Sequence, residues 1–306
     1  MKIVVLMSTY NGDRFLEEQI DSILAQDIKE NAQMQLIVRD DGSKDDTTHI
    51  LDAYQNEQKL TWYASENLGP EKSFWDLLKN APDADYYAFC DQDDVWFPDK
   101  LSRAILRLSG EPQDKPLLYC SGFTATDGQL QPLVMHQSPL HRYTDYAHAL
   151  VYSTAPGCTF VLNRATKCLA SRYDMDSDYV VMHDWLIHKI VTVMGGIMVY
   201  DATPSMYYRQ HGSNLIGVKS SGFKDFLQRI HRFWVGTGRQ TRSECAKSLL
   251  HVYGEDVSRQ AYSALDLVAN YRGNIGKKIA FMRDRRFRTG TINDLFLAAL
   301  ILLERV

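Results

Sequence analysis

The sequence lacks long hydrophobic runs and paired cysteines. Its longest apolar stretch, residues 295–303, has about half of the ~20 residues that a membrane-spanning helix needs. The apolar run near the amino terminus is too short for the core of a signal peptide. Five cysteines form an odd set without CxxC spacing, which indicates neither a disulfide framework nor a zinc knuckle. We therefore expect a cytoplasmic protein whose thiols stay reduced.

Low-complexity tracts, internal repeats and a strong charge of one sign are also missing. Hydrophobic residues make up 45% and charged residues 24% of the 306-residue chain, as is usual for a globular protein. The net charge of −4 divides unevenly, because residues 1–218 carry 18 Lys and Arg against 30 Asp and Glu, whereas residues 219–306 carry 16 against 8. With the Gly/Ser-rich stretch 212–222 at their junction, we predict two parts with different partners, residues 1–218 and 219–306. The acidic first part argues against nucleic-acid binding.

The beginning of the chain alternates apolar strands with amphipathic helices. Strands are predicted at 2–7, 35–39, 60–63 and 86–90, and helices at 15–24, 45–54, 71–79 and 99–109. Such alternation through short loops predicts an α/β fold with parallel strands.

The alternation stops after residue 109. Further strands are predicted at 117–121, 158–162 and 197–200, a loop at 126–142 and a helix at 183–194. Beyond residue 222 the pattern predicts only amphipathic helices, at 223–235, 241–253, 257–271, 275–282 and 292–303. We expect this region to be a helical appendage.

Polar segments follow the first four predicted strands. They read STYNG, DDGS, ENLG and DQDD. Open α/β sheets bind ligands outside the carboxyl ends of their strands. The segments therefore predict one ligand site at one edge of the sheet.

Three carboxylates within DQDD, those of Asp91, Asp93 and Asp94, form the sharpest motif. They repel one another unless a cation lies among them, and oxygen ligands suit Mg²⁺ or Mn²⁺. Helix capping is the alternative, but it accounts for one aspartate at most. We favour a metal site.

A second carboxylate pair, Asp40 and Asp41, ends the second strand. One of the two could accept the imino N–H of a uracil or thymine base, with Thr9, Tyr10 and Asn11 as the other wall of the site. The alternative is a simple turn and helix N-cap, for which the serine and aspartate that follow would suffice.

Taken in order, these segments resemble inverting family 2 glycosyltransferases with the GT-A fold. The matching motifs are STYNG, VRDDGSxDxT, NLG and FCDQDDVWxPDK, and the resemblance covers roughly residues 1–215. DQDDVW together with the later YRQHGSN is most similar to bacterial rhamnosyltransferase-type enzymes of polysaccharide assembly. The implied fold is a Rossmann-like nucleotide-sugar-binding sheet.

The resemblance implies a nucleotide-sugar donor and a divalent cation, Mn²⁺ or Mg²⁺. Asp41 would bind the pyrimidine, with Asp40 as a second partner. Asp93 would ligate the metal, supported by Asp91 or Asp94. The other expected nucleotide-site residues are Thr9, Tyr10, Asn11, Asn67, Gly69, Lys72 and Arg209, with His211 as a third metal ligand. A solvated helix face for Lys72 and a structural role for His211 are the alternatives.

The family's general base falls in an ED or HD pair at the start of a helix. His183-Asp184-Trp185 matches this pattern, so Asp184 is the candidate base, and His183, Trp185 and Gly157 are expected to border the acceptor. Asp184 would take the proton of an acceptor hydroxyl as that hydroxyl attacks the anomeric carbon. The alternative is an ordinary helix-start aspartate, which the helix dipole favours.

The predicted function is metal-dependent, inverting transfer of a sugar, with L-rhamnose as one candidate, from a dTDP- or UDP-sugar. The acceptor would be a saccharide or lipid-linked saccharide of bacterial cell-surface polysaccharide assembly. One alternative is a nucleotidyltransferase, although no Gly-rich, lysine-bearing phosphate loop lies near the amino terminus. Another is a non-catalytic sugar-nucleotide or polysaccharide-binding module, which would be expected to lose Asp184 or the DxD; both are present.

The basic tail allows two interpretations. A cluster of arginines precedes an apolar segment, residues 291–306: Arg283, Arg285, Arg286 and Arg288. Such a combination could lie peripherally on the anionic inner face of the cell membrane. Alternatively, these helices pack on the catalytic domain or on a second subunit.

Overall fold

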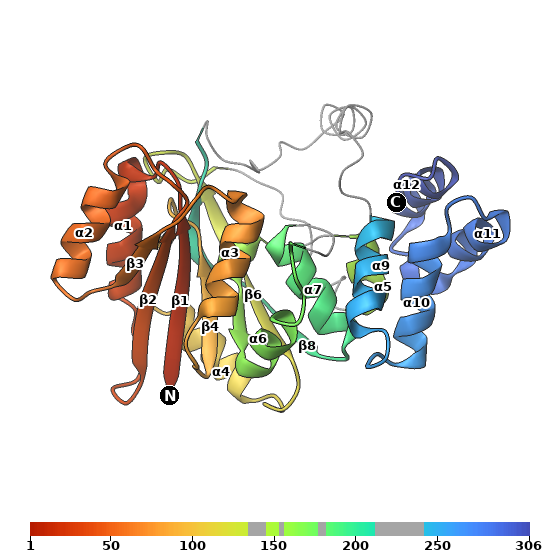
Figure 1. The fold of residues 1–306 in the computed structure, drawn as a ribbon, viewed down its shortest axis with the longest axis horizontal. Helices are drawn as coiled ribbons and strands as arrows, with labels where there is room; N and C mark the ends of the chain where they lie inside the picture. Colours follow the sequence, from red (N-terminus) through yellow and green to blue (C-terminus); the bar gives the residue numbers. More distant parts are fainter. Residues whose placement is uncertain (134–144, 153–155, 177–181, 212–241) are drawn as a thin grey trace.

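One eight-stranded sheet organises residues 2–209, in the order β3-β2-β1-β4-β7-β6-β8-β5 (Figure 1). The computed structural model describes residues 1–133, 145–152, 156–176, 182–211 and 242–306. The strands are β1 (Lys2–Thr9), β2 (Gln33–Asp40), β3 (Thr61–Ala64), β4 (Tyr86–Cys90), β5 (Val95–Trp96), β6 (Leu117–Thr126), β7 (Val161–Asn163) and β8 (Ile197–Arg209). Strands and helices alternate as predicted, which confirms the α/β fold.

The first four strands pair in parallel, as expected. The helices that follow β1, β2, β3 and β5 are α1 (Asp13–Leu24), α2 (Thr47–Asn56), α3 (Gly69–Asn80) and α4 (Lys100–Ser109). Farther along, β7 runs antiparallel to β4 and β6, and the short β5, which the sequence pattern missed, runs antiparallel to β8. The complete sheet is therefore mixed.

Alternate residues of β1 face two separate hydrophobic layers. Ile3 and Val5 belong to the cluster that α1 covers, whereas Val4 and Leu6 belong to the cluster that α3 covers. All of them are buried, because successive strand side chains point to opposite faces and both faces carry helices. This explains why the sequence of β1 is a continuous apolar run from Ile3 to Met7.

The second half of the sheet bends. Strands β6 and β8 extend well beyond the predicted 117–121 and 197–200, and their pairing shifts register around Gly122. A Cβ on Gly122 would lie 2.6 Å from the carbonyl oxygen of Ala202, so only glycine allows the strands to approach here. With this shift in register, the β6–β8 pairing continues from Leu117 to Thr126 as one long ladder.

The prediction of a strand at 158–162 is wrong at its beginning. Residues Gly157–Thr159 form a 3₁₀ turn, η2, and only Val161–Asn163 pair as β7. Pro156 starts the turn, and its carbonyl oxygen accepts hydrogen bonds from the backbone N–H of Thr159 at 3.0 Å and from its hydroxyl at 2.9 Å. Helix α7 (His183–Val193) agrees with the predicted 183–194, while α5 (Tyr146–Val151) and α6 (Arg164–Ala170) were not predicted.

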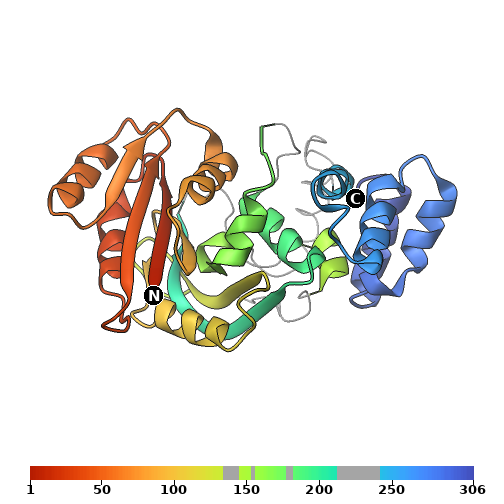
Figure 2. The ribbon, with the colours of Figure 1, turned by 60° about the horizontal axis from the view of Figure 1, so that its bottom comes forward.

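The carboxy-terminal helices lie at the end of the molecule opposite α2 (Figures 1 and 2). They are α9 (Arg242–Tyr253), α10 (Arg259–Asn270), α11 (Ile275–Arg283), the 3₁₀ turn η3 (Arg285–Phe287) and α12 (Thr291–Leu302). Four of the five predicted helices are thus confirmed; the fifth, 223–235, and the predicted junction 212–222 lie outside the described residues. Among the described helices, none combines the length and the apolar character needed to cross a bilayer.

Candidate active site

Hydrogen bonds join the loops that follow β1, β2 and β4. The side-chain amide of Gln92 donates to the carbonyl oxygen of Tyr10 at 3.1 Å and accepts from its N–H at 2.8 Å. The N–H of Asn11 donates to the Ser43 hydroxyl at 2.8 Å, and the Asn11 side chain accepts from the N–H of Lys44 at 2.9 Å. The predicted segments therefore meet at one edge of the sheet.

Asp40 uses its carboxylate entirely within its own loop and β1. One oxygen accepts from the N–H groups of Gly42 at 3.1 Å and Ser43 at 2.9 Å. The other accepts from the hydroxyls of Thr9, at 3.2 Å, and Ser43. Because an ionised carboxylate offers about four acceptor positions, all are taken. Asp40 shapes the loop, and a nucleotide would have to displace one of these donors to reach it.

Asp41 retains room for another donor. Its first oxygen accepts from Arg39 and from the N–H of Leu68 at 3.0 Å, and its second accepts from the N–H of Gly69 at 2.9 Å. One acceptor position of about four is left. Asp41, rather than Asp40, is thus the carboxylate that has an acceptor position left.

A buried arginine holds Asp41 in place, and sequence reasoning missed it. Arg39 is fully buried and also donates to Asp76 at 3.2 Å and to the Ser73 hydroxyl at 3.0 Å. Its partners in α3 lie far from it in the sequence. The only sequence signal for Arg39 was its place in the VRDDGS motif. That signal was missed because charged residues near a strand end ordinarily lie on the surface.

The segment after β3 contributes mainly backbone N–H groups to the site, those of Leu68 and Gly69. Asn67 accepts from the N–H of Gly69 at 3.2 Å, and Gly69 has φ +76°, a left-handed conformation that glycine tolerates best. Lys72 makes an ion pair with Asp176 at 2.6 Å. A phosphate would therefore compete with Asp176 for the Lys72 ammonium.

The three carboxylates of the DQDD segment are buried, in the case of Asp94, or partly buried, in the case of Asp91 and Asp93. Burial raises the pKa of Asp91 to about 7, with the charges of Asp93 and Asp184 adding to the rise. Burial raises the pKa of Asp93, and burial with both neighbouring charges raises that of Asp94. Asp94 is fully buried, and its Oδ2 has no partner among the described residues. Within the described residues, one carboxylate oxygen of the cluster is therefore left without a hydrogen-bond donor.

A divalent cation fits this cluster. His211 Nε2 lies 2.7 Å from Asp93 Oδ2, so an imidazole is already beside the carboxylates. Ligand atoms of Asp91, Asp94 and Cys158 lie within 4.8 Å of one another. Burial keeps the pKa of Cys158 well above its usual value, so it stays a thiol and a poor ligand. Carboxylate oxygens suit Mn²⁺ or Mg²⁺.

Arg209, the last residue of β8, forms hydrogen bonds with the acidic loop that contains Asp93 and Asp94. Its Nε donates to the carbonyl oxygen of Asp93 at 2.9 Å, and its backbone N–H donates to the Asp94 carboxylate at 3.1 Å. The remaining guanidinium nitrogens contact Gly128, at 2.7 Å, and Glu18. To hold a diphosphate, as predicted, Arg209 would exchange its Glu18 partner.

Lys100 is a second buried cation that the sequence did not reveal as a site residue. Its ammonium donates to the carbonyl oxygen of Cys158 at 2.6 Å and lies 4.3 Å from the centre of the Trp96 ring. Burial lowers the pKa of Lys100, while the charges of Asp94 and Asp91 oppose that shift. It places a positive group beneath the carboxylates.

Asp184 occupies the first turn of α7, as predicted, and is only 7% exposed. Its Oδ2 accepts from the N–H of Gly157 at 3.1 Å, and its Oδ1 from the N–H of Trp185 at 2.8 Å. Burial raises the pKa of Asp184 to about 6, and the buried Lys189 works against the rise. Such a carboxylate is ionised at neutral pH yet basic enough to accept a proton.

His183 is buried between two phenylalanines. Its ring stacks on Phe74 at 4.2 Å and meets Phe89 edge-on at 5.2 Å. Neither ring nitrogen has a hydrogen-bond partner within the described ranges, and burial lowers the pKa of His183 to about 3. The imidazole is neutral, and a Cβ on Gly157 would lie 2.6 Å from its Nε2.

The η2 turn connects the candidate base with the acidic cluster. Gly157 donates its N–H to Asp184, and the neighbouring Cys158 donates its thiol to Asp91. Asp184 and Asp91 are close enough for the charge of Asp184 to raise the pKa of Asp91. Residues from three separate parts of the sequence thus form one site.

The sequence model of Glycosyl transferase family 2 matches residues 4–157. The dTDP-rhamnosyl transferase RfbG of Shigella flexneri is 26% identical over 309 residues, which cover 96% of this chain and 99% of RfbG. The poly(ribitol-phosphate) beta-N-acetylglucosaminyltransferase TarS of Staphylococcus aureus strain Mu50 is 26% identical over 158 residues, 51% of this chain and 27% of TarS.

Solved structures share the fold. Residues 1–349 of S. aureus TarS superpose with a TM-score of 0.58 at 17% identity, covering all of this chain and 81% of that one. The mannosyltransferase PcManGT of Pyrobaculum calidifontis, solved with GDP-Man and Mn²⁺, gives 0.53 at 14% identity, covering 99% and 80%. The family match spans half of the chain and includes every loop joined above. The chain therefore belongs to glycosyl transferase family 2 and is a glycosyltransferase with the GT-A fold.

Proposed function

We propose that the protein is a metal-dependent, inverting transferase that moves a sugar from a dTDP- or UDP-sugar to a saccharide or lipid-linked saccharide acceptor of bacterial cell-surface polysaccharide assembly. The observation that carries the proposal is Asp184, a buried carboxylate with a pKa of about 6 joined through η2 to the acidic cluster. L-Rhamnose is the sugar that we favour, because the similarity to RfbG extends over nearly the whole of both chains.

The donor base would meet Asp41. Uracil and thymine both present an imino N–H, and Asp41 has one acceptor position left for it. Tyr10, which is 46% exposed, would border the base. The other proposed nucleotide contacts are Thr9, Asn11, Asp40, Asn67, Gly69, Lys72 and Arg209.

The metal would be held by Asp91, Asp93, Asp94 and His211. When bound, Mn²⁺ or Mg²⁺ supplies positive charge that stabilises the leaving diphosphate. The protein's own contribution is the orientation of these ligands, with Arg209 bracing the loop and Lys100 beneath it.

Asp184 would act as the general base on the acceptor hydroxyl. The hydroxyl oxygen attacks the anomeric carbon, the bond from that carbon to the diphosphate breaks, and the proton passes to Asp184. Attack and departure on opposite faces invert the configuration. His183, Trp185 and Gly157 would border the acceptor.

We further propose a cytoplasmic enzyme at the inner face of the membrane. Residues 1–218 would form its catalytic part, and residues 219–306 would contact the membrane, the acceptor or a second copy of the chain. The charge division of the sequence supports this assignment.

A thermal-shift panel of UDP-, GDP- and dTDP-sugars, with and without Mn²⁺, tests the proposal. A ligand at 100 times its Kd should add about 2.7 kcal/mol to the free energy of unfolding. We expect a dTDP- or UDP-sugar with Mn²⁺ to raise the Tm, and Asp41→Asn to reduce that rise. If no nucleotide sugar stabilises the protein, the proposed function is wrong.

A further inference from the structure

Helix α12 is apolar on two opposite sides. Leu297, Leu300 and Ile301 are buried in the carboxy-terminal core. On the other side, Leu295 is 74% exposed and Leu302 is 59% exposed. A helix at the surface of a globular protein normally presents polar residues outward. The outer side of α12 therefore lacks the composition of a solvent-facing helix.

Exposed apolar side chains concentrate in this part of the molecule. Of the thirteen large hydrophobic residues that are exposed within the described ranges, six belong to α11, α12 or the residue that follows α12: Ile275, Ile279, Leu295, Phe296, Leu302 and Leu303. Scattered single exposures are ordinary, but a concentration of this kind marks an interaction surface.

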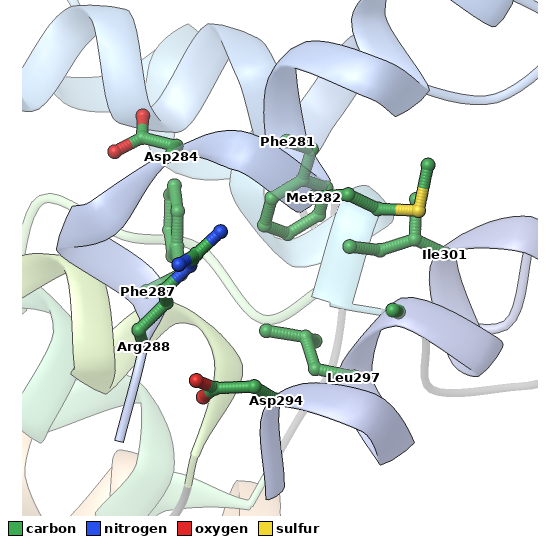
Figure 3. Close-up of a pocket in the computed structure, with 9 residues that line it drawn as sticks. Phe281, Met282, Asp284, Phe287, Arg288, Asp294, Leu297 and Ile301 are labelled. Atoms are coloured by element: carbon green, nitrogen blue, oxygen red, sulfur yellow. The ribbon is translucent and has the colours of Figure 1, made fainter. Parts of the chain in front are cut away.

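The two helices lie side by side. Lys278, near the start of α11, pairs with Glu304, just after α12, at 2.7 Å. At the other end of α11, Phe281 and Met282 line a small pocket with Leu297 and residues of η3 (Figure 3). Their exposed side chains therefore belong to one region, which we call the α11–α12 surface: the six apolar residues above with Arg283, Arg285 and Arg288.

The arginines of this surface carry unbalanced charge. Arg283, Arg285 and Arg288 are exposed, and none makes an ion pair in the part of the chain that the structure describes. Arg286, in contrast, is bound by Asp284 at 2.6 Å. Arg288 lies beside the start of α12, on the rim of the pocket in Figure 3.

We propose that the α11–α12 surface docks on an anionic lipid bilayer. Leucine and isoleucine side chains of an interfacial helix enter the boundary between headgroups and acyl chains, and arginines bind lipid phosphates. A second copy of the chain fits less well, since a two-fold symmetric contact would bring this surface, with its unpaired arginines, against itself. This inference rests on the proposed membrane location of the enzyme and assigns the contact to named residues of α11 and α12, but it requires no sugar transfer.

Co-sedimentation of the full chain with vesicles tests the proposal. Vesicles of phosphatidylcholine alone are compared with vesicles that also contain phosphatidylglycerol. We expect the anionic vesicles to bind at least about tenfold more tightly, because each arginine near such a surface contributes roughly a factor of five. Leu295→Ser with Leu302→Ser, and separately Arg283→Ala with Arg285→Ala and Arg288→Ala, should each weaken binding about tenfold or more.

Helix α4 provides matched controls. Leu106 is 70% exposed and Arg107 beside it is exposed, so Leu106→Ser and Arg107→Ala remove the same groups far from the α11–α12 surface. These variants should bind vesicles like the unaltered chain. Circular dichroism and thermal unfolding without ligand establish that every variant is folded.

Three results would overturn the docking proposal: no binding to anionic vesicles, equal binding to both vesicle types, or full binding by the Leu295→Ser, Leu302→Ser variant. Self-association in sedimentation velocity that this variant abolishes, without vesicle binding, would assign the surface to a second copy instead. The vesicle assay needs no donor, so its failure is distinguishable from failure of the nucleotide-sugar panel.

Discussion

Asp184 is the residue on which the proposed chemistry depends most directly. Asparagine has nearly the same size, and its single amide oxygen can keep one of the two N–H hydrogen bonds from Gly157 and Trp185, but it cannot take a proton. We expect Asp184→Asn to lower the transfer rate by about 10²–10⁴-fold, as is typical for loss of a general base. The donor-induced thermal shift should be unchanged, because Asp184 is proposed to contact the acceptor and not the donor. Full transfer activity in this variant would contradict the base assignment.

The pKa of Asp184 predicts the acid side of the pH profile. Burial raises that pKa to about 6, so the carboxylate is protonated and inactive as a base below this pH. The value of kcat/KM should therefore rise as pH increases through about 6 and then level off. The measurement is initial rates between pH 4.5 and 8 in buffers of constant ionic strength. A flat profile over this range would count against Asp184.

Gly157 leaves no space for a side chain. A methyl group there would lie 2.6 Å from the Nε2 atom of His183 and 3.1 Å from the Cβ of Asp184. We expect Gly157→Ala to displace Asp184 and to lower the transfer rate at least about tenfold, since small misplacements of catalytic groups are costly. Gly110→Ala is the matched control, because its Cβ meets nothing closer than 3.6 Å. Equal rates for both variants would disprove the steric role.

The sequence predicted the carboxylates of the site better than their roles. The resemblance named Asp41 first and Asp40 second as partners of the base, but the acceptor position that Asp41 retains depends on donors after β3, which the sequence does not place. Arg39 and Lys100 were missed as site residues because charged side chains are expected at the surface, and their burial follows from partners distant in sequence.

At the scale of elements, α5 is tied to η3 through one histidine. His148 Nδ1 contacts the Asp145 carboxylate, and its Nε2 lies 3.0 Å from the carbonyl oxygen of Arg288. Both partners can only accept hydrogen bonds, so both are satisfied only when the ring carries two protons. The Asp145 contact raises the pKa of His148, with a further contribution from Asp294.

This contact predicts a pH-dependent stability. Since the pKa of His148 is raised on folding, its stabilisation is complete below about 6.5, the unfolded value, and is lost as pH rises through the folded value. We expect His148→Ala to lower the free energy of unfolding by about 1 kcal/mol at pH 6 and by less at pH 9. Urea titrations at the two pH values measure the difference. An equal loss of unfolding free energy at pH 6 and pH 9 would mean that His148 stabilises the protein by packing and not through its second proton.

Strong periodicity made the helices and the long strands predictable. The pattern failed where an element is too short to repeat, as in β5 and η2, or where its face is set by a distant neighbour, as in α5 and α6. Those short elements matter most to the site, because η2 joins Asp184 to the acidic cluster. The predicted loop 126–142 and helix 223–235 fall largely or wholly outside the described residues.

At the scale of the whole molecule, the acidic residues of 1–218 and the basic residues of 219–306 contribute to different surfaces. The excess of acidic residues in 1–218 includes the buried cluster that fits a cation. The excess of basic residues in 219–306 includes the arginines of the α11–α12 surface. A net charge near zero thus conceals an acidic cluster in the first region and an exposed basic surface in the second.

The hydrophobic core, however, does not divide where the charge does. A single cluster of buried side chains runs from the sheet through α7 and into the carboxy-terminal helices; it includes Leu118, Ile187, Leu249 and Ile301. Packing that is continuous in this way couples the unfolding of the two regions. We expect one calorimetric transition whose van't Hoff and calorimetric enthalpies agree.

Ile301→Ala provides the sharper form of this prediction. Ile301 is fully buried in that cluster, and its truncation should cost about 2–5 kcal/mol. If the core unfolds as one unit, the variant lowers the Tm of the entire protein, and donor binding is lost at the same lowered temperature. If residues 1–218 and 219–306 unfold separately, only one of two transitions moves and donor binding persists above it. Calorimetry with and without the stabilising nucleotide sugar decides between these outcomes, because the proposed donor contacts lie at one edge of the sheet, far from α12.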